Sequence, residues 1–400
     1  EDLDGYTEMS IVRCQMCTVQ ADFSSLSHYM DGVIEGSLRA GNDHNLLLGL
    51  GHTATSQLFL GRYDNAWDKA QETLAVARRA GDRVHEAEML CFTVPLILAR
   101  NGQLDQALET AREGVEIAYR IGAIIGIADG EWVTAEIHRM RGEYEQALAA
   151  GHRSLEAAMP LESFMPFYVV HPLGTLGSVY LEISPRFTDK IAEFHRYALR
   201  LLETPIGKIA GGKTWADLGW CALTLGDVEL ADTLFTQGLN YPTMMALIER
   251  SRHLAGMALV RLRQGAAAEA RDLATEALAF AEAHEMHHYE PQARLTLGQV
   301  LAASGQHEAA LEEFDRDVEI RASVLEATPA ARQLALRPIV RQTRGAAARS
   351  LAALGRPDEA TQAQSEALQA MEEIAALFQD EELKGAYRSG AMNDASFVSP

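Results

Sequence analysis

The stretch GRYDNAWDKAQETLAVARRAGD, Gly61 to Asp82, is repeated in outline by GQLDQALETAREGVEIAYRIG, Gly102 to Gly122. Each stretch opens on glycine, has alanine five residues later, and then keeps apolar residues at helical spacing. The gap between the third and fourth copies spans two periods, and Ile191 takes the alanine place of the copy inside it. The pair recurs at a nearly constant interval, as Gly61/Ala66, Gly102/Ala107, Gly142/Ala147, Gly226/Ala231, Gly265/Ala270, Gly305/Ala310 and Gly355/Ala360.

This period predicts two antiparallel helices per unit, with the glycine in the turn between them, where a positive φ favours glycine. A small residue stands seven positions before most of these glycines, and Gly81 and Gly122 stand where a left-handed C-cap would end the second helix. One helix pair cannot bury its apolar face alone, so the units must stack. We therefore expect an all-α, right-handed superhelical solenoid of about nine units.

The expected array covers residues 1–380, followed by a partly disordered tail over 381–400. A divergent first unit is included because Arg39-Ala-Gly41 stands one repeat period before Arg79-Ala-Gly81. The nine units are expected to start near residues 2, 43, 83, 123, 163, 207, 245, 286 and 330.

Composition excludes several classes of protein. The chain has 400 residues, 35 Lys plus Arg against 56 Asp plus Glu, and a formal net charge of −21, which argues against direct nucleic-acid binding. Four cysteines cannot form a disulfide framework. The most apolar stretch, Phe164 to Leu181, is interrupted by two prolines and a histidine, so a buried helix is expected rather than a membrane span. With no leader sequence at Glu1, we expect a cytoplasmic protein.

The repeated residues resemble the tetratricopeptide repeat (TPR), in which a glycine-led turn separates a helix carrying a small residue from a helix that opens with alanine. The period is longer than that of the usual TPR and is similar to the variant found in bacterial signal-transduction ATPases, namely LuxR-type activators and cyclase–ATPase–TPR regulators. The resemblance implies a non-catalytic module that binds a protein, a peptide or a small effector, as the sensor part of a larger regulator. A free-standing assembly scaffold is a further alternative.

Three motifs suggest chemistry that the repeat phase disfavours. Residues 207–214, GKIAGGKT, match the Walker A pattern, and a nucleotide-binding or hydrolysing protein using this loop is the main alternative function. However, predicted helices flank the match, and an inter-repeat loop is the preferred interpretation.

HEMHH, His284 to His288, matches a zinc-protease motif, but Glu285 falls where Gly81 and Gly122 end their helices. Cys14 and Cys17 have CxxC spacing without a second pair.

We therefore predict no catalytic residues, no metal site and no cofactor. Counting back from each turn glycine along the first helices places candidate ligand-binding residues on the concave face. Basic residues at this phase favour a ligand with anionic or carboxylate groups. The predicted groove residues are Phe92, Trp132, Glu136, Arg139, Lys213, Trp220, Arg252, Gln299 and Arg349.

Overall fold

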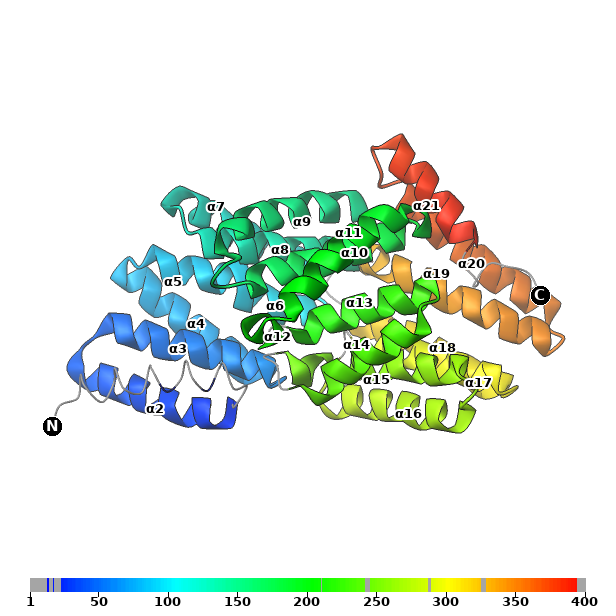
Figure 1. Ribbon diagram of the computed structural model, residues 1–400, viewed down its shortest axis with the longest axis horizontal. Coiled ribbons are helices and arrows are strands. Elements are labelled where there is room, and N and C mark those ends of the chain that lie inside the picture. The colour runs from blue at the N-terminus through cyan, green and yellow to red at the C-terminus, as the bar shows by residue number, and fades with distance from the viewer. Residues whose placement is uncertain are drawn as a thin grey trace.

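A computed structural model describes the backbone of residues 23–209, 211–241, 245–286, 289–324 and 329–393, together with Arg13 and Cys17. Side chains are described within these ranges except at 23, 24 and 27, across 320–336 and at 392–393. The described residues form helices and no strand, so the all-α class is confirmed. Figure 1 shows helix pairs running from α2 (Phe23–Ala40) at one end to α20 (Pro357–Ala375) and α21 (Glu381–Asn393) at the other.

Each complete unit consists of a first helix and a second helix that pack against one another. The first helices are α3 (Asp43–Phe59), α5 (Arg83–Glu88) continued by η1 (Met89–Thr93) and α6 (Val94–Arg100), α8 (Ile124–Met140), α10 (Phe167–Ile183), α13 (Gly211–Leu225), α15 (Ala246–Arg263), α17 (Glu290–Ala303) and α19 (Pro329–Ala353). The second helices are α4 (Tyr63–Ala80), α7 (Leu104–Ile121), α9 (Tyr144–Ala158), α11 (Thr188–Leu202), α14 (Val228–Asn240), α16 (Ala267–Ala283), α18 (His307–Val324) and α20. Short helices η2 (Met159–Leu161), η3 (Pro185–Phe187) and α12 (Pro205–Ile209) lie between them.

The turn glycines have the backbone conformation that their spacing predicts. All seven have a positive φ, between 72° and 90°, and the C-capping Gly81 and Gly122 have φ values of 71° and 69°. The copy without a glycine turns instead through Ser184, whose backbone is extended. Ile191 is fully buried, like the alanines at the same phase in six of the seven other copies, so it fills their place at the start of the second helix.

Small residues in the first helices allow close packing inside a pair. A Cβ atom added to Gly219 would lie 2.6 Å from the Phe235 ring, and one added to Gly298 would lie 2.3 Å from the Phe314 ring. Both distances are shorter than van der Waals contact. The Phe235 ring of α14 and the Phe314 ring of α18 therefore lie directly on the backbones of α13 and α17.

The solenoid also packs on itself, through contacts between units far apart in sequence. One hydrophobic cluster joins Tyr63 to Ile248 and Met286, and Tyr144 packs against Phe378 and Tyr387, with ring centroids 6.3 and 5.8 Å apart. We call these contacts the seam. They bring the turns between α3 and α4 and between α8 and α9 against units that follow several repeats later in the chain. One superhelical turn therefore lies on the next.

The C-terminal segment differs from the expected tail. Residues 381–393 form α21, in which Tyr387 is fully buried against Tyr144 and Phe378. The seam explains the difference, because α21 covers apolar surface that neighbouring helices alone would leave open. Residues 394–400 lie outside the described part of the chain.

The apolar stretch over 164–181 is accounted for by α10, a central helix with an unbroken buried run from Val169 to Tyr180. In the described part of the chain, no helix has both the length and the apolar character that a membrane crossing requires.

Glu285 provides a test of the repeat phase. It is the one non-glycine residue with a positive φ among those described, at 52°, and α16 ends two residues before it. A residue with a side chain is destabilised in this conformation by roughly 1–2 kcal/mol relative to glycine. Glycine, however, loses more conformational entropy on folding, so the substitution recovers only part of this energy. We predict that Glu285→Gly raises the free energy of unfolding by about 1 kcal/mol in urea titrations. Gly265→Ala (φ 82°) should change it in the opposite direction; equal signs for the two variants would contradict this explanation.

Candidate functional site

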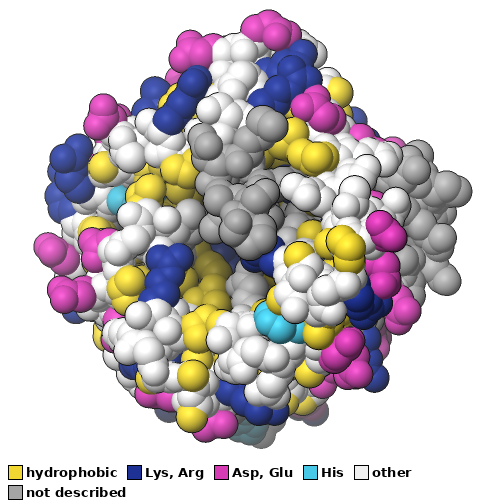
Figure 2. All heavy atoms as spheres, turned by 90° about the vertical axis from the view of Figure 1, so that its right-hand side faces the viewer, with side chains coloured by type: hydrophobic (Ala, Val, Ile, Leu, Met, Phe, Trp, Pro, Cys, Tyr) yellow, Lys and Arg dark blue, Asp and Glu magenta, His cyan; other side chains and the backbone are white. Residues whose placement is uncertain are grey.

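Aromatic side chains from consecutive first helices form a stack. Trp132 on α8 is 2 % exposed and lies between Phe92 of η1 and His171 of α10, with ring centroids 6.0 and 4.8 Å away. Phe59 of α3 meets Phe92 edge-on. Consecutive units therefore contribute to one stack on what we call the inner face, the surface of the first helices around Trp132. Figure 2, an end-on view, shows a central hollow with hydrophobic and Lys/Arg side chains on its wall.

A π-helical turn in the first helix of its unit positions Phe92. Pro95 has no N–H to donate to the preceding turn. The turn before it widens to a π-helix over Met89–Thr93, in which the Val94 N–H bonds to the Met89 carbonyl. Such single π turns often occur where a helix contributes to a functional site.

A polar bridge connects this stack to a row of charged groups. The indole N–H of Trp132 donates to Thr175 Oγ1 at 3.0 Å, and the Thr175 hydroxyl donates to Glu136 Oε1 at 2.6 Å. The Lys213 ammonium lies 5.7 Å from the centre of the Trp132 ring, within cation–π range. Residues from α8, α10 and α13 therefore orient one another.

The charged groups form a continuous row across α8, α10, α13 and α15, which we call the charged chain. Its links are Glu182–Arg139 (2.9 Å), Arg139–Glu136 (3.2 Å), Glu136–Lys213 (3.0 Å), Lys213–Asp217 (2.5 Å), Asp217–Arg252 (2.8 Å) and Arg252–Glu249 (2.8 Å). The hydroxyl of Tyr289, which lies directly before α17, donates to Glu249 and extends the row to the next unit.

Burial and pairing act in opposite directions on these groups. Burial alone would raise the pKa of Asp217, but Lys213 and then Arg252 hold it well below its usual range. The pKa of Glu136 is also lowered, because Lys213 and Arg139 outweigh the effect of burial. At Glu182 burial prevails, and its pKa is raised despite the contact with Arg139. The middle of the charged chain is therefore ionised and internally neutralised.

A second group of carboxylates on the inner face is unpaired. Asp129, which is half-buried, lies on the same face of α8 as Trp132 and Glu136, and Glu88, which is exposed, belongs to the preceding first helix. Neither has a hydrogen bond or an ion pair with any residue that the structure describes. Burial and then the charge of Glu88 raise the pKa of Asp129 well above its ordinary value. Burial and then the charges of Asp129 and Glu88 also raise the pKa of Tyr168.

The structure brings together six of the nine predicted groove residues. Phe92, Trp132, Glu136, Arg139, Lys213 and Arg252 all belong to the stack or the charged chain. The other three lie elsewhere. Trp220 packs edge-on against Phe235 of α14, Gln299 is half-buried on α17, and Arg349 is half-buried on α19.

The sequence prediction missed the carboxylate partners. Asp217 and Glu249 stand four residues after Lys213 and three before Arg252, which is the spacing of ion pairs on one helix face. This spacing could have identified them. Glu182 and Thr175 had no such signal, because their partners lie on the first helix of the preceding unit.

The Walker-like segment is helical rather than the loop that we expected. Residues 205–209 form α12 and 211–225 form α13, where Gly211, Gly212, Lys213 and Thr214 are all buried. Packing against α10 and α15 buries these first residues of α13, and Lys213 is held by Glu136 and Asp217. The segment therefore lacks the open phosphate-binding loop of Walker A sites.

The other two motifs have structural explanations where they are described. Glu285 has a positive φ two residues beyond the end of α16, so the helix ends directly before the HEMHH motif, with His284 as its C-cap; His287 and His288 lie outside the described residues. Cys14 also lies outside them, whereas Cys17, Cys91 and Cys221 are buried. Burial raises the pKa of Cys221 to about 12, which leaves this thiol unreactive.

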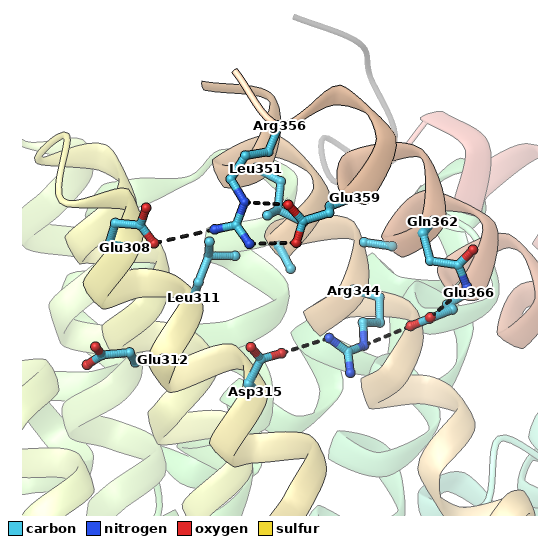
Figure 3. A pocket seen from close by; sticks show the side chains of 12 residues that line it. Glu308, Leu311, Glu312, Asp315, Arg344, Leu351, Arg356, Glu359, Gln362 and Glu366 are labelled. Carbon is cyan, nitrogen blue, oxygen red and sulfur yellow. Dashed lines mark hydrogen bonds and ion pairs between the residues drawn. The ribbon is translucent and has the colours of Figure 1, made fainter. Parts of the chain in front are cut away.

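A separate hollow of about 380 Å³ lies between α18, α19 and α20 (Figure 3). Arg344 bridges Asp315 and Glu366, and Arg356 bridges Glu308 and Glu359. These ion pairs cross the hollow and join neighbouring helices. Because they are largely exposed, each contributes little to stability, and the inner face remains the better candidate site.

The charged chain predicts a large effect of neutralising its central carboxylate. Asp217→Asn would leave Lys213 and Arg252 buried with too little negative charge, and breaking a buried pair costs roughly 3–5 kcal/mol. We expect a loss of about 3 kcal/mol in the free energy of unfolding at neutral pH, measured by urea titration. The matched variant Asp232→Asn, which loses a more exposed contact with Arg261, should change it by less than about 1 kcal/mol. Similar losses in both variants would show that burial does not distinguish the two sites.

Comparison with known proteins supports the fold. No family model and no curated protein matches the chain. It is similar to the Rap conjugation gene regulator of plasmid pLS20, solved in complex with the Phr* peptide, with a TM-score of 0.55, 11 % identity, and coverage of 94 % of this chain and 97 % of that one. The apo quorum sensor NprR from B. thuringiensis gives a TM-score of 0.49 at 13 % identity, covering 92 % and 100 %. A Rap protein complexed with Competence and Sporulation Factor gives 0.47 at 11 %, covering 93 % and 99 %. The likeness to the pLS20 regulator supports a TPR-type solenoid and extends to the fold alone.

Proposed function

We propose that the inner face is a non-catalytic binding site for a peptide that presents a cationic group. The observation that carries the proposal is the position of two carboxylates without a described partner, the exposed Glu88 and the half-buried Asp129, four residues before Phe92 and three before Trp132 on their helices. A lysine or arginine side chain, or an N-terminal amine, would neutralise these carboxylates. An adjacent apolar residue of the peptide would pack beside Phe92.

The charges on the inner face favour a cationic ligand, whereas the sequence led us to expect an anionic one. The charged chain contains three cations, Arg139, Lys213 and Arg252, and each already has carboxylate partners. Its carboxylates number four, namely Glu136, Glu182, Asp217 and Glu249. An anionic ligand would have to compete with these fixed partners, whereas a cation would find Glu88 and Asp129 without one.

The pLS20 regulator supports the choice of a peptide as the ligand class. That protein was solved with the Phr* peptide, and its fold matches 94 % of this chain. A solenoid also suits an extended ligand, because successive first helices present their residues along one continuous surface.

The wider role that we propose is that of the sensor part of a larger cytoplasmic bacterial regulator. This role rests on the resemblance of the long repeat units to the arrays of signal-transduction ATPases. Peptide binding would then favour one arrangement of the array and so shift the state of a neighbouring domain. A scaffold would differ in that its partner binds without changing such an equilibrium.

Peptide binding can be tested with two matched pools of fluorescein-labelled hexapeptides, one containing a single lysine and the other a single glutamate at the same positions. We predict that the lysine pool binds more tightly in fluorescence anisotropy titrations. Glu88→Gln combined with Asp129→Asn should weaken its binding by at least about tenfold, because the two carboxyl groups that a bound cation would hold in the ionised form are lost without a change in shape.

The control for this experiment is Glu312→Gln, which neutralises an exposed carboxylate on α18, away from the inner face. Circular dichroism should show unchanged helicity in all variants. Equal binding of both peptide pools, or equal weakening by the control, would reject the proposed site.

The nucleotide-binding alternative receives its own test. Because the Walker-like residues are buried in α13, we predict no saturable binding of ATP with Mg²⁺ in equilibrium dialysis. Tight binding that is lost in Lys213→Gln, with helicity retained, would instead favour the nucleotide-binding protein.

A further inference from the structure

Two histidines and an aspartate meet where two consecutive first helices begin. His44 lies in the first turn of α3, and His85 lies in the first turn of α5. They stand three and four residues after Gly41 and Gly81, which occupy the same place in their units. Stacking of the units therefore brings the two rings together, with centroids 5.7 Å apart and planes at 76°.

Asp82 completes the group. Its Oδ1 accepts hydrogen bonds from the Val84 and His85 N–H groups and so caps α5, while its Oδ2 lies 2.9 Å from His85 Nδ1. One ligand atom from each of His44, Asp82 and His85 lies within 4.8 Å of the other two. Among the described residues, no other group of three histidine, cysteine or acidic side chains meets this geometry.

The three residues differ in how firmly they are held. His85 is 7 % exposed and bonded to Asp82, so its ring is fixed before any ligand arrives. Asp82 is half-buried and fixed by its role as helix cap. His44 is exposed. The group is therefore open to solvent on the side of His44 and preorganised on the other side.

The surrounding charges permit a cation here. Helix N-termini carry partial positive charge, which opposes a bound cation, but Asp82 and Asp43 lie at the beginnings of α5 and α3. The nearby arginines are already paired: Arg78 and Arg83 contact Glu86, and Arg79 contacts Asp43.

We propose that His44, Asp82 and His85 bind a divalent transition-metal ion of the Zn²⁺ type. Two imidazole nitrogens and one carboxylate oxygen are a ligand set that zinc prefers, whereas Mg²⁺ and Ca²⁺ prefer oxygen ligands alone. The open side next to His44 leaves the fourth position of a tetrahedral ion to water. The bound ion joins the beginnings of α3 and α5, and so connects two adjacent units of the solenoid.

The proposal can be tested by isothermal titration of the EDTA-treated full chain with ZnCl₂. We expect one tight ion per chain, with affinity reduced at least about tenfold in His44→Ala, since one of three protein ligands is lost. Asp82→Asn should weaken binding as well while preserving the fold, because asparagine caps helices as well as aspartate does. Zn²⁺ should raise the melting temperature of the wild type and have a smaller effect on both variants.

His28→Ala is the matched control, because His28 is another exposed histidine, on the neighbouring helix α2. It should bind Zn²⁺ like the wild type. Wild-type affinity in His44→Ala, or an equal loss in His28→Ala, would overturn the proposal. Cobalt substitution gives an independent measurement: the wild type should show the visible absorption of four-coordinate Co²⁺, and its persistence in His44→Ala would also overturn the assignment.

Discussion

The packing of one superhelical turn on the next is the constraint from which the other features follow. The seam places the α3–α4 turn beside Met286 and the α8–α9 turn beside Phe378 and Tyr387. First helices in the middle of the array pack against their neighbours, and charged side chains on them, such as Asp217 and Glu249, are almost fully buried. A buried charge without a partner is costly, so the interior must satisfy its own charges.

The charged chain provides the buried charges with partners. Asp217 receives Lys213 from its own helix and Arg252 from the next unit, so a single carboxylate fixes how α13 and α15 lie together. Replacing such a network by apolar residues is often neutral for stability. We infer that its specific contribution is geometric, because the Glu136–Lys213 and Asp217–Arg252 pairs each join first helices of different units. Glu88, which is exposed, and Asp129, which is half-buried, lie outside this network, and we propose them as the positions available to a ligand.

Local features of the fold were predictable from sequence, and features that depend on the superhelix were not. The glycine period identified the turns, the buried alanines and Ile191, because each depends on residues within one helix pair. The position of Glu285 beyond the end of α16 followed from the same phase. Tyr387 could not be placed, because the Tyr144 ring that covers it belongs to a unit several repeats earlier in the chain. In the candidate site, too, features of a single helix were predictable and contacts between units were not. Helical phase selected Trp132, Lys213 and Arg252 for the inner face, but it could not show that carboxylates from neighbouring units neutralise the cations.

The arrangement of charges also favours the N-terminal part of the inner face as the place where the proposed ligand would bind. The middle of the array already pairs its cations, and a ligand there would have to break contacts such as that between Lys213 and Asp217. Glu88 and Asp129 require no such exchange, so a cation gains their attraction without displacing a partner. Glu88 lies one turn after His85 on the first helix of its unit. The proposed ligand, by joining Glu88 to Asp129, would couple the unit that carries His85 to the unit that carries Trp132.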